Sequence, residues 1–144
     1  TVESFVHSIH SRTLLACVKE NNLITKKEIQ EINNFFYKEN EKYSKVQKKA
    51  RNDFNKWFLI NWKCNQFLLE KYGGNMVLSA FGFHQAAEAE RKYLQKLQQE
   101  GKFKIYDKKL KKEFWQKLNK EKFGDGVVSE ERGKEILDNP PWKK

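Results

Sequence analysis

Apolar side chains recur at alternating steps of three and four residues over positions 41–72, which is the spacing of one face of an α-helix. In the second half of this stretch the face widens until the helix is apolar nearly all round. We therefore expect the first half to lie on the surface and the second half to enter the core. Gly73 and Gly74 predict the end of the helix, because glycine readily adopts the left-handed conformation of a C-cap. The face consists of Tyr43, Val46, Ala50, Trp57, Ile60, Cys64 and Phe67, with the polar Asp53 in register, and is widened by Phe54, Phe58, Leu59, Trp62 and Leu68.

Shorter helical patterns lie on both sides of this long helix. One of them follows Thr25, because Thr25 and Glu28 have the spacing of a capping box, in which each side chain accepts from the other residue's backbone amide. This helix is expected to run to about Glu39, with little break before the long helix. The flanking helices are predicted at residues 2–20, 26–39, 84–100, 107–120 and 129–137.

Two further segments complete the prediction of the fold. Residues 75–83 are apolar and bounded by glycine, so a short strand and a short buried helix both fit. Residues 123–128 predict a Gly-rich loop. Because no second strand is expected to pair with residues 75–83, a helical turn or a buried loop is favoured there. The sequence thus predicts an all-α fold: a single domain over residues 1–144, with five to six helices packed around one long central helix at about 41–72.

The composition agrees with a helical fold that has a core. Two Pro and seven Gly leave long stretches rich in Lys, Glu, Gln and Leu, which favour helices. Aromatic residues make up 14% of the chain and can fill a core although 33% of the residues are charged. No run of about 18 apolar residues occurs, so no membrane span is predicted. The chain begins at Thr1 without a signal-peptide pattern, which we interpret as a processed or trimmed chain.

The net charge of +10 leaves two interpretations open. It would attract an acidic partner, such as nucleic acid or an anionic membrane surface. It also fits a solvated, Lys-rich surface: Lys outnumbers Arg by 25 to 4, and Arg is the residue that makes bidentate contacts with phosphates and bases. The solvated surface is favoured. A basic nucleic-acid-binding helical domain is the alternative, and a contiguous Lys face that includes Arg51 and Arg91 would favour it.

The sequence contains no pattern typical of catalysis or cofactor binding. Neither GxxxxGK[ST] nor GxGxxG occurs, and no triad, paired carboxylates or nucleophile elbow can be identified. Glu3, His7 and His10 share one side of the first predicted helix at a spacing that could hold a divalent metal, but three residues on one exposed turn are more often solvated. We therefore predict a protein that is not an enzyme, with no catalytic residues, no metal and no cofactor.

Cys17 and Cys64 each occupy an apolar helical position. They form no CxxC or CxxCH pattern, which excludes the usual zinc-ribbon and haem-attachment spacings. A disulfide between them is one interpretation for an oxidising compartment, but it needs Cα atoms about 4.4–6.8 Å apart and converging side chains. Two unrelated core positions seldom meet that requirement, so buried free thiols are favoured.

Several short segments carry a resemblance to a known family. Ile24-Thr25-Lys26-Lys27-Glu28-Ile29 is similar to the segment that opens a helix, ahead of a long amphipathic helix, in the N-terminal domain of SurA-like periplasmic chaperones. Residues 71–78, 101–107 and 114–115 resemble a group of uncharacterised bacterial proteins sometimes assigned to these chaperones. The resemblance covers about residues 24–115. It implies a periplasmic or secreted protein with a chaperone-like role and no catalytic residues.

Our functional hypothesis follows from this resemblance and the aromatic composition. We expect a bacterial envelope domain that handles extended or unfolded polypeptide partners in an aromatic groove; a cytoplasmic location is the alternative. A groove that stays open in the folded monomer would favour this hypothesis over nucleic-acid binding. The candidate groove residues are Trp62, Phe81, Phe83, Tyr93 and Trp115.

Overall fold

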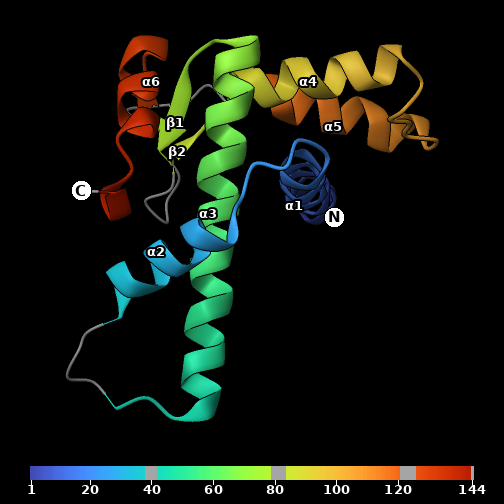
Figure 1. The fold of residues 1–144 in the computed structure, drawn as a ribbon. Helices are drawn as coiled ribbons and strands as arrows, with labels where there is room; N and C mark the ends of the chain where they lie inside the picture. Colours follow the sequence, from blue (N-terminus) through green and yellow to red (C-terminus); the bar gives the residue numbers. More distant parts are fainter. Residues whose placement is uncertain (38–41, 79–83, 121–125, 144) are drawn as a thin grey trace.

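The computed structural model describes residues 1–37, 42–78, 84–120 and 126–143. The described part is a mainly α single domain with a long central helix, which confirms the predicted fold class (Figure 1). Three short strands add a small sheet. The helices are α1 (Val2–Glu20), α2 (Lys26–Phe36), α3 (Lys45–Tyr72), α4 (Ala87–Gln99), α5 (Lys108–Lys120) and α6 (Glu130–Asp138), followed by the 3₁₀ turn η1 (Pro141–Lys143).

The central helix α3 forms the axis of the molecule. In Figure 1, α1, α4 and α5 lie on one side of it, and α2 and α6 lie on the other. A capping box starts the helix: Ser44 Oγ accepts from the Gln47 amide at 3.2 Å, and Gln47 Oε1 accepts from the Ser44 amide at 2.9 Å. The predicted start near residue 41 is therefore too early. The predicted end is confirmed, since α3 stops at Gly73 with a φ of +64°.

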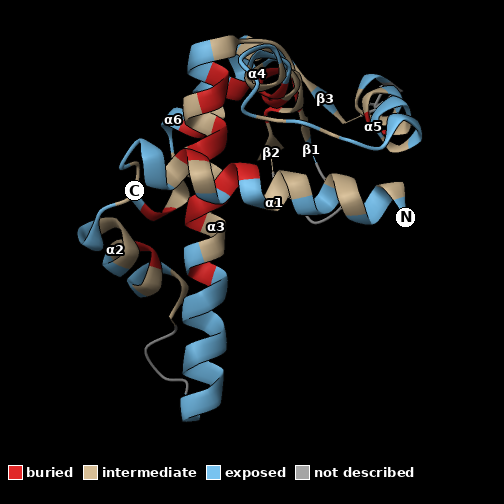
Figure 2. Cartoon of the chain, turned by 90° about the vertical axis from the view of Figure 1, so that its right-hand side faces the viewer, coloured by how far each residue is buried: buried red, intermediate tan, exposed pale blue. Residues whose placement is uncertain are grey.

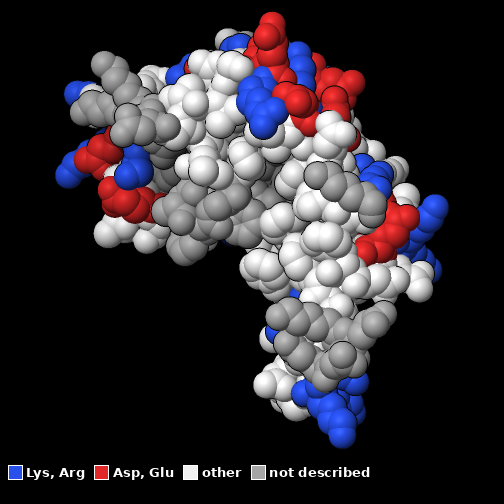
Figure 3. All heavy atoms as spheres, turned by 90° about the vertical axis from the view of Figure 1, so that its left-hand side faces the viewer, with Lys and Arg blue, Asp and Glu red and all other residues white. Residues whose placement is uncertain are grey.

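Burial changes along α3 as the sequence predicts. Val46 is 79% exposed, whereas Leu59, Ile60 and Cys64 are buried. Figure 2 shows the first half of the helix extending from the body as an exposed rod, which we call the α3 projection (residues 45–54). Lys and Arg side chains gather at its tip on the face seen in Figure 3. The apolar pattern did not reveal that three asparagines are buried on this helix, namely Asn55, Asn61 and Asn65.

The predicted continuity between the second helix and the long helix is wrong. The helix α2 ends at Phe36, and Tyr37 is extended, with φ −80° and ψ 127°. Residues 38–41 lie outside the described residues. Tyr37 instead turns back on α3, where its hydroxyl donates to Asn52 Oδ1 at 2.6 Å. The expected capping box between Thr25 and Glu28 is present at the start of α2.

The prediction of a turn or loop without strands at residues 75–83 is wrong for residues 76–78, and residues 79–83 lie outside the described residues. Strand β1 (Met76–Leu78) pairs antiparallel with β2 (His84–Gln85) and with β3 (Val127–Val128), in the order β2-β1-β3. The partner strands are only two residues long, too short for an alternating pattern to show in the sequence. Because β2 takes up His84 and Gln85, α4 begins at Ala87, later than predicted. Likewise, β3 lies within the segment predicted as a Gly-rich loop.

Two apolar clusters pack against α3. The larger joins α1, α3, α4, α6 and β1, and includes Leu14, Cys17, Cys64 and Leu68. The smaller joins α2, α3 and η1 and consists of Ile32, Leu59 and Trp142, with half-buried aromatic rings around them. Within the described residues, no helix combines the length and the apolar character needed to cross a membrane.

Candidate functional site

The structure distributes the predicted groove residues over separate contacts. Trp62 packs between Phe58 and Trp142, with ring centroids 5.9 Å and 5.2 Å away, and its indole N–H donates to the Leu137 carbonyl at 2.9 Å. This side chain joins α3 to the C-terminal end of the chain.

The other predicted residues lie elsewhere. Trp115 on α5 packs edge-on against Phe114 at 5.1 Å and against Phe103 at 6.5 Å. Tyr93 lies on α4, with its ring 5.8 Å from that of Tyr72. Phe81 and Phe83 fall outside the described residues. Trp62, Trp115 and Tyr93 therefore do not form one surface, and Tyr93 is the one of these three that lines the groove described next.

A large open groove lies between α1, the last turns of α3 and α4, and we call it the α1–α4 groove. Its volume is about 740 Å³. Aromatic side chains from three parts of the chain line it: Phe67 and Tyr72 on α3, Tyr93 on α4, and Phe103 in the connector after α4. The apolar edges of α1 and α4 complete the floor.

The fold of α4 determines the position of Tyr93. Ala86, Ala89 and Leu94 are buried, so one face of α4 is anchored in the core and Tyr93 lies at its edge. Burial raises the pKa of Tyr93 to about 12, with a further contribution from the negative charge of Glu20. Its phenol therefore stays neutral at physiological pH and can donate a hydrogen bond to a ligand.

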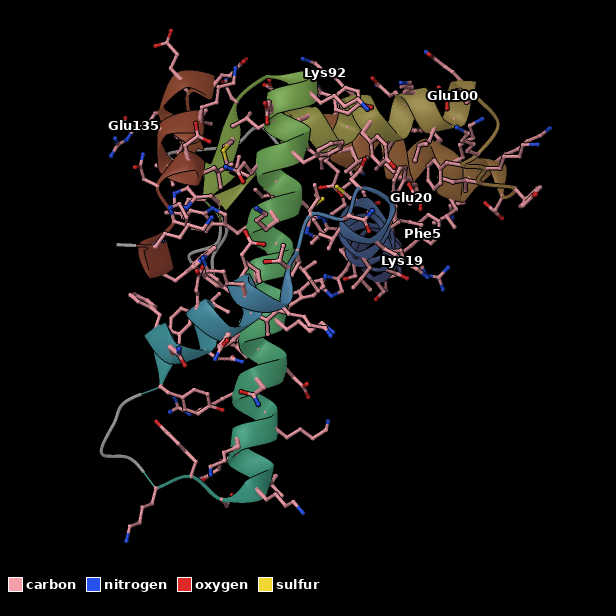
Figure 4. All side chains as sticks on the ribbon, viewed as in Figure 1. Phe5, Lys19, Glu20, Lys92, Glu100 and Glu135 are labelled. Carbon is pink, nitrogen blue, oxygen red and sulfur yellow. The ribbon has the colours of Figure 1, made fainter. Side chains whose placement is uncertain are left out.

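Charged side chains surround the aromatic floor. Figure 4 labels Glu20 on α1 and Glu100 at the end of α4, which belong to the two helices that form the walls. Nζ of Lys102 lies 3.0 Å from Oε2 of Glu100, and the hydrogen bond between the two side chains lowers the pKa of the Glu100 carboxyl. Lys71 Nζ lies 5.4 Å from the centroid of the Phe67 ring, within the range of a cation–π contact.

The charge balance of the groove is basic. Its lining includes four basic side chains and two acidic ones: Arg12, Lys71, Lys96 and Lys102 against Glu20 and Glu100. The groove thus combines aromatic rings with an excess of positive charge, a chemistry that suits apolar groups flanked by carboxylates.

The group Glu3, His7 and His10 is not brought together as a metal site. Glu3 pairs with Lys117 on α5 at 3.4 Å, and His10 pairs with Glu90 on α4 at 2.8 Å. Among the described residues, no cluster of three His, Cys, Asp or Glu has an arrangement that could hold a metal ion.

The two cysteines are free and buried, as the sequence favours. Both belong to the larger apolar cluster, Cys17 on α1 and Cys64 on α3. The neighbouring Cys17 thiol and the deep burial raise the pKa of the Cys64 thiol, which keeps it protonated and unreactive.

Comparisons with known proteins give no relative from which a function could be transferred. No protein-family model matches the sequence, and neither the curated proteins nor the solved structures give a match. The function has therefore to be inferred from the chain's own residues.

Proposed function

We propose that this chain is a non-enzymatic helical binding domain that holds a segment of polypeptide in the α1–α4 groove. The observation that carries the proposal is the groove itself, a hollow of about 740 Å³ whose floor is formed by aromatic rings from α3, α4 and the following connector. Aromatic side chains offer a large contact area at a low cost in conformational entropy, which suits them to varied polypeptide partners.

The charge of the groove specifies the partner further. Four basic and two acidic side chains line it, and Glu100 is already paired with Lys102. A segment with apolar side chains and interspersed Asp or Glu would place its apolar groups on Tyr72 and Tyr93 and its carboxylates near Arg12 and Lys71. The methylene chain of Lys71 can also contact apolar groups of the partner, because it covers ring surface while the ammonium group stays in water.

The chaperone-like role and the envelope location remain predictions. The capping box at Thr25 and Glu28 is present as the SurA-like resemblance implies, but it is a general helix start. Fractionation of cells that express the full-length protein tests the location directly. Recovery with the periplasmic fraction would agree with the prediction, and recovery with the cytoplasm would support the alternative.

Fluorescence anisotropy with labelled peptides tests the groove. One peptide alternates Leu and Phe with Glu, and a matched peptide has Lys in place of Glu. We expect the acidic peptide to bind at least about tenfold more tightly, because like charges at the rim disfavour the basic one. Tighter binding of the basic peptide, or equal binding of both, would contradict the proposal.

A matched pair of variants locates the binding. Tyr93→Ala removes a ring from the groove and should weaken binding of the acidic peptide about tenfold, the effect of losing an aromatic anchor. Tyr106→Ala removes the same atoms from a residue that is 89% exposed and does not line the groove, so binding should not change. Tyr93→Phe should bind nearly as well as the wild type if it is the ring that matters.

A second candidate function rests on the α3 projection. Lys45, Lys48, Lys49 and Lys56 recur at helical spacing on one side of α3 and are exposed, with Asp53 as an i,i+4 partner of Lys49 at 3.1 Å. This is the surface that supports the alternative of nucleic-acid binding (Figure 3). Arg51 lies on the projection whereas Arg91 lies on α4, so the two arginines come from different helices. A face that joined them to the lysines would have favoured this candidate.

Salt dependence tests this second candidate. We expect weak, sequence-independent binding to duplex DNA that falls steeply with salt, because each neutralised phosphate releases a counterion. The double variant Lys45→Glu, Lys48→Glu should abolish binding to DNA, whereas Lys109→Glu on α5 should change the affinity little. An equal effect of both variants would exclude the projection as the binding surface.

A further inference from the structure

A second pocket lies next to the α1–α4 groove, between α1, α4 and α5. Ile9 and Leu94 line both hollows and form the wall between them. The second pocket has a volume of about 190 Å³. Its polar lining consists of Glu3, His7 and His10 from α1, with Gln85 and Glu90 from β2 and α4.

A buried carboxylate forms the base of this pocket. The Glu90 side chain is 8% exposed, and its two oxygens each lie 2.8 Å from Nδ1 of His10. At that distance from a carboxylate, Nδ1 carries the hydrogen and donates it. Gln85 Nε2 donates to Oε2 of Glu90 at 3.2 Å. Because a carboxylate has about four acceptor positions, these two donors leave Glu90 with capacity for further hydrogen bonds.

The charges around Glu90 favour a cation. Among the described residues, His10 is its ion-pair partner, and an imidazole is charged only when protonated. With a neutral His10, the carboxylate would be buried among neutral donors, which is an unfavourable arrangement. Glu3 adds a second carboxylate at the pocket, where it meets Lys117 at 3.4 Å.

The opposite wall of the pocket is apolar. Val6, Leu94, Phe114 and Leu118 face the polar group from three helices. A cavity of about 150 Å³ holds one benzene ring. The observed volume of about 190 Å³ therefore admits a single ring with a short polar head.

We propose that this pocket binds a small aromatic cation, with its ring against Leu94, Phe114 and Leu118 and its N–H donors on the Glu90 carboxylate. A planar amidinium or a protonated aromatic amine has N–H donors for the lone pairs of the Glu90 carboxylate that His10 and Gln85 do not use. This binding site is separate from the proposed polypeptide groove, since the two share only the wall residues Ile9 and Leu94.

Three isosteric probes separate charge from shape. Benzamidine, benzamide and benzoate have the same ring and nearly the same head but carry charges of +1, 0 and −1. We expect benzamidine to shift the NMR signals of residues around Glu90 in a saturable manner, benzamide to bind at least about tenfold more weakly, and benzoate not to bind. Equal affinity of the three probes, or preferred binding of benzoate, would overturn the proposal.

Variants then test the location. Glu90→Gln keeps the size of the side chain but removes the charge, so benzamidine should bind no better than benzamide. If Glu90→Gln does not fold, Leu118→Trp fills the pocket from its half-exposed wall without altering Glu90 or His10, and benzamidine binding should be lost. Tyr93→Ala, which alters the α1–α4 groove, should leave benzamidine binding unchanged. Undiminished binding to Leu118→Trp, or a loss with Tyr93→Ala, would place benzamidine outside this pocket and overturn the proposal.

Discussion

The turn that ends α3 is held by carboxylates from two other helices. The Gly74 amide donates to Oε2 of Glu130 on α6 at 2.7 Å, and the Asn75 amide donates to Oε2 of Glu88 on α4 at 2.9 Å. Both glutamates lie in the first turn of their helices, where the helix dipole stabilises negative charge. At the scale of single residues, two backbone amides thus position three helices relative to one another.

Replacement of Gly74 tests how tightly this turn is packed. Gly74 has a φ of +96°, and a Cβ would lie 2.5 Å from Oε2 and 2.8 Å from Cβ of Glu88. Gly74→Ala should lower the free energy of unfolding by about 2–4 kcal/mol, the sum of left-handed strain and a disturbed hydrogen bond. Gly101→Ala is the control, because φ is +73° there but the nearest atom is 3.8 Å away, so only strain of about 1 kcal/mol is expected. Urea denaturation measures the free energy of unfolding of both variants. Equal losses of stability would mean that the Glu88 side chain moves aside to make room for the new methyl group.

The buried thiols give a second prediction at this scale. Cys17 is 1% exposed and Cys64 is fully buried. A thiol reagent such as DTNB should therefore not react with the native protein and should titrate both thiols in urea. Because no disulfide is present, a reductant should leave the melting temperature unchanged. Prompt labelling of native protein would place a cysteine on the surface and contradict the structure.

At the scale of elements, Glu28 connects the start of α2 to two other parts of the chain. Its carboxylate accepts from the Thr25 amide at 3.0 Å and pairs with Lys63 on α3 at 3.0 Å and with Lys143 of η1 at 3.6 Å. Burial alone would raise its pKa, but the hydrogen bond from Lys63 and that from the Thr25 amide outweigh burial and lower it.

The stability should therefore depend on the ionisation of Glu28. A lowered carboxyl pKa adds stability above the ordinary value of 4.5, and this stability is lost as the pH falls through the lower value of the folded state. Glu28→Gln should cost about 1–3 kcal/mol at pH 7, the range for hydrogen bonds to charged groups, and should reduce the loss on acidification. Glu31→Gln is the matched control, since Glu31 pairs with an exposed Lys27 at 3.7 Å. This variant should lower the free energy of unfolding by less than about 1 kcal/mol. Similar losses for the two variants would argue against the Glu28 network.

The elements differ in how far the sequence could predict them. The second half of α3 could be predicted because its apolar positions repeat over several turns, and α2 because Thr25 and Glu28 form a local capping box. The strands could not, because β2 and β3 have two residues each and are defined by pairing with the distant β1. The buried Asn65 also escaped prediction: its Oδ1 accepts from the Ala86 amide at 2.8 Å, a contact that only the tertiary structure creates.

At the scale of the whole molecule, the candidate sites are products of long-range packing. Tyr93 was predicted as a groove residue and lines the α1–α4 groove, but Phe67, Tyr72 and Phe103 join it there from other elements, and nothing in their local sequence indicates this. The same holds for His10 and Glu90, which are 80 residues apart. Periodicity predicts which residues face inward on a helix, not which helices lie next to each other.

The C-terminal Trp142 gives a prediction for the packing of the whole chain. It is 6% exposed and packs on Ile32, Leu59 and two aromatic rings, so Trp142→Ala should cost about 3–5 kcal/mol in thermal or urea unfolding. Within the described residues, its indole N–H is a buried donor with no hydrogen-bond partner. Trp142→Phe removes that donor and keeps a ring, so it should cost less than about 1.5 kcal/mol. A large loss with Phe would contradict this expectation and would mean that the full volume of the indole is needed in the cluster.

The contribution of α3 to both apolar clusters has a consequence for the dynamics of the chain. Ile24 and Trp62 pack against both clusters, so neither cluster can open without disturbing the other. Backbone amides in the buried half of α3 can then exchange hydrogen with solvent only when the whole domain unfolds, whereas amides of the projection can exchange through local fraying. One continuous helix should thus contain both the slowest and some of the fastest amides, and hydrogen-exchange measurements should show protection that rises steeply between residues 54 and 59, where burial begins.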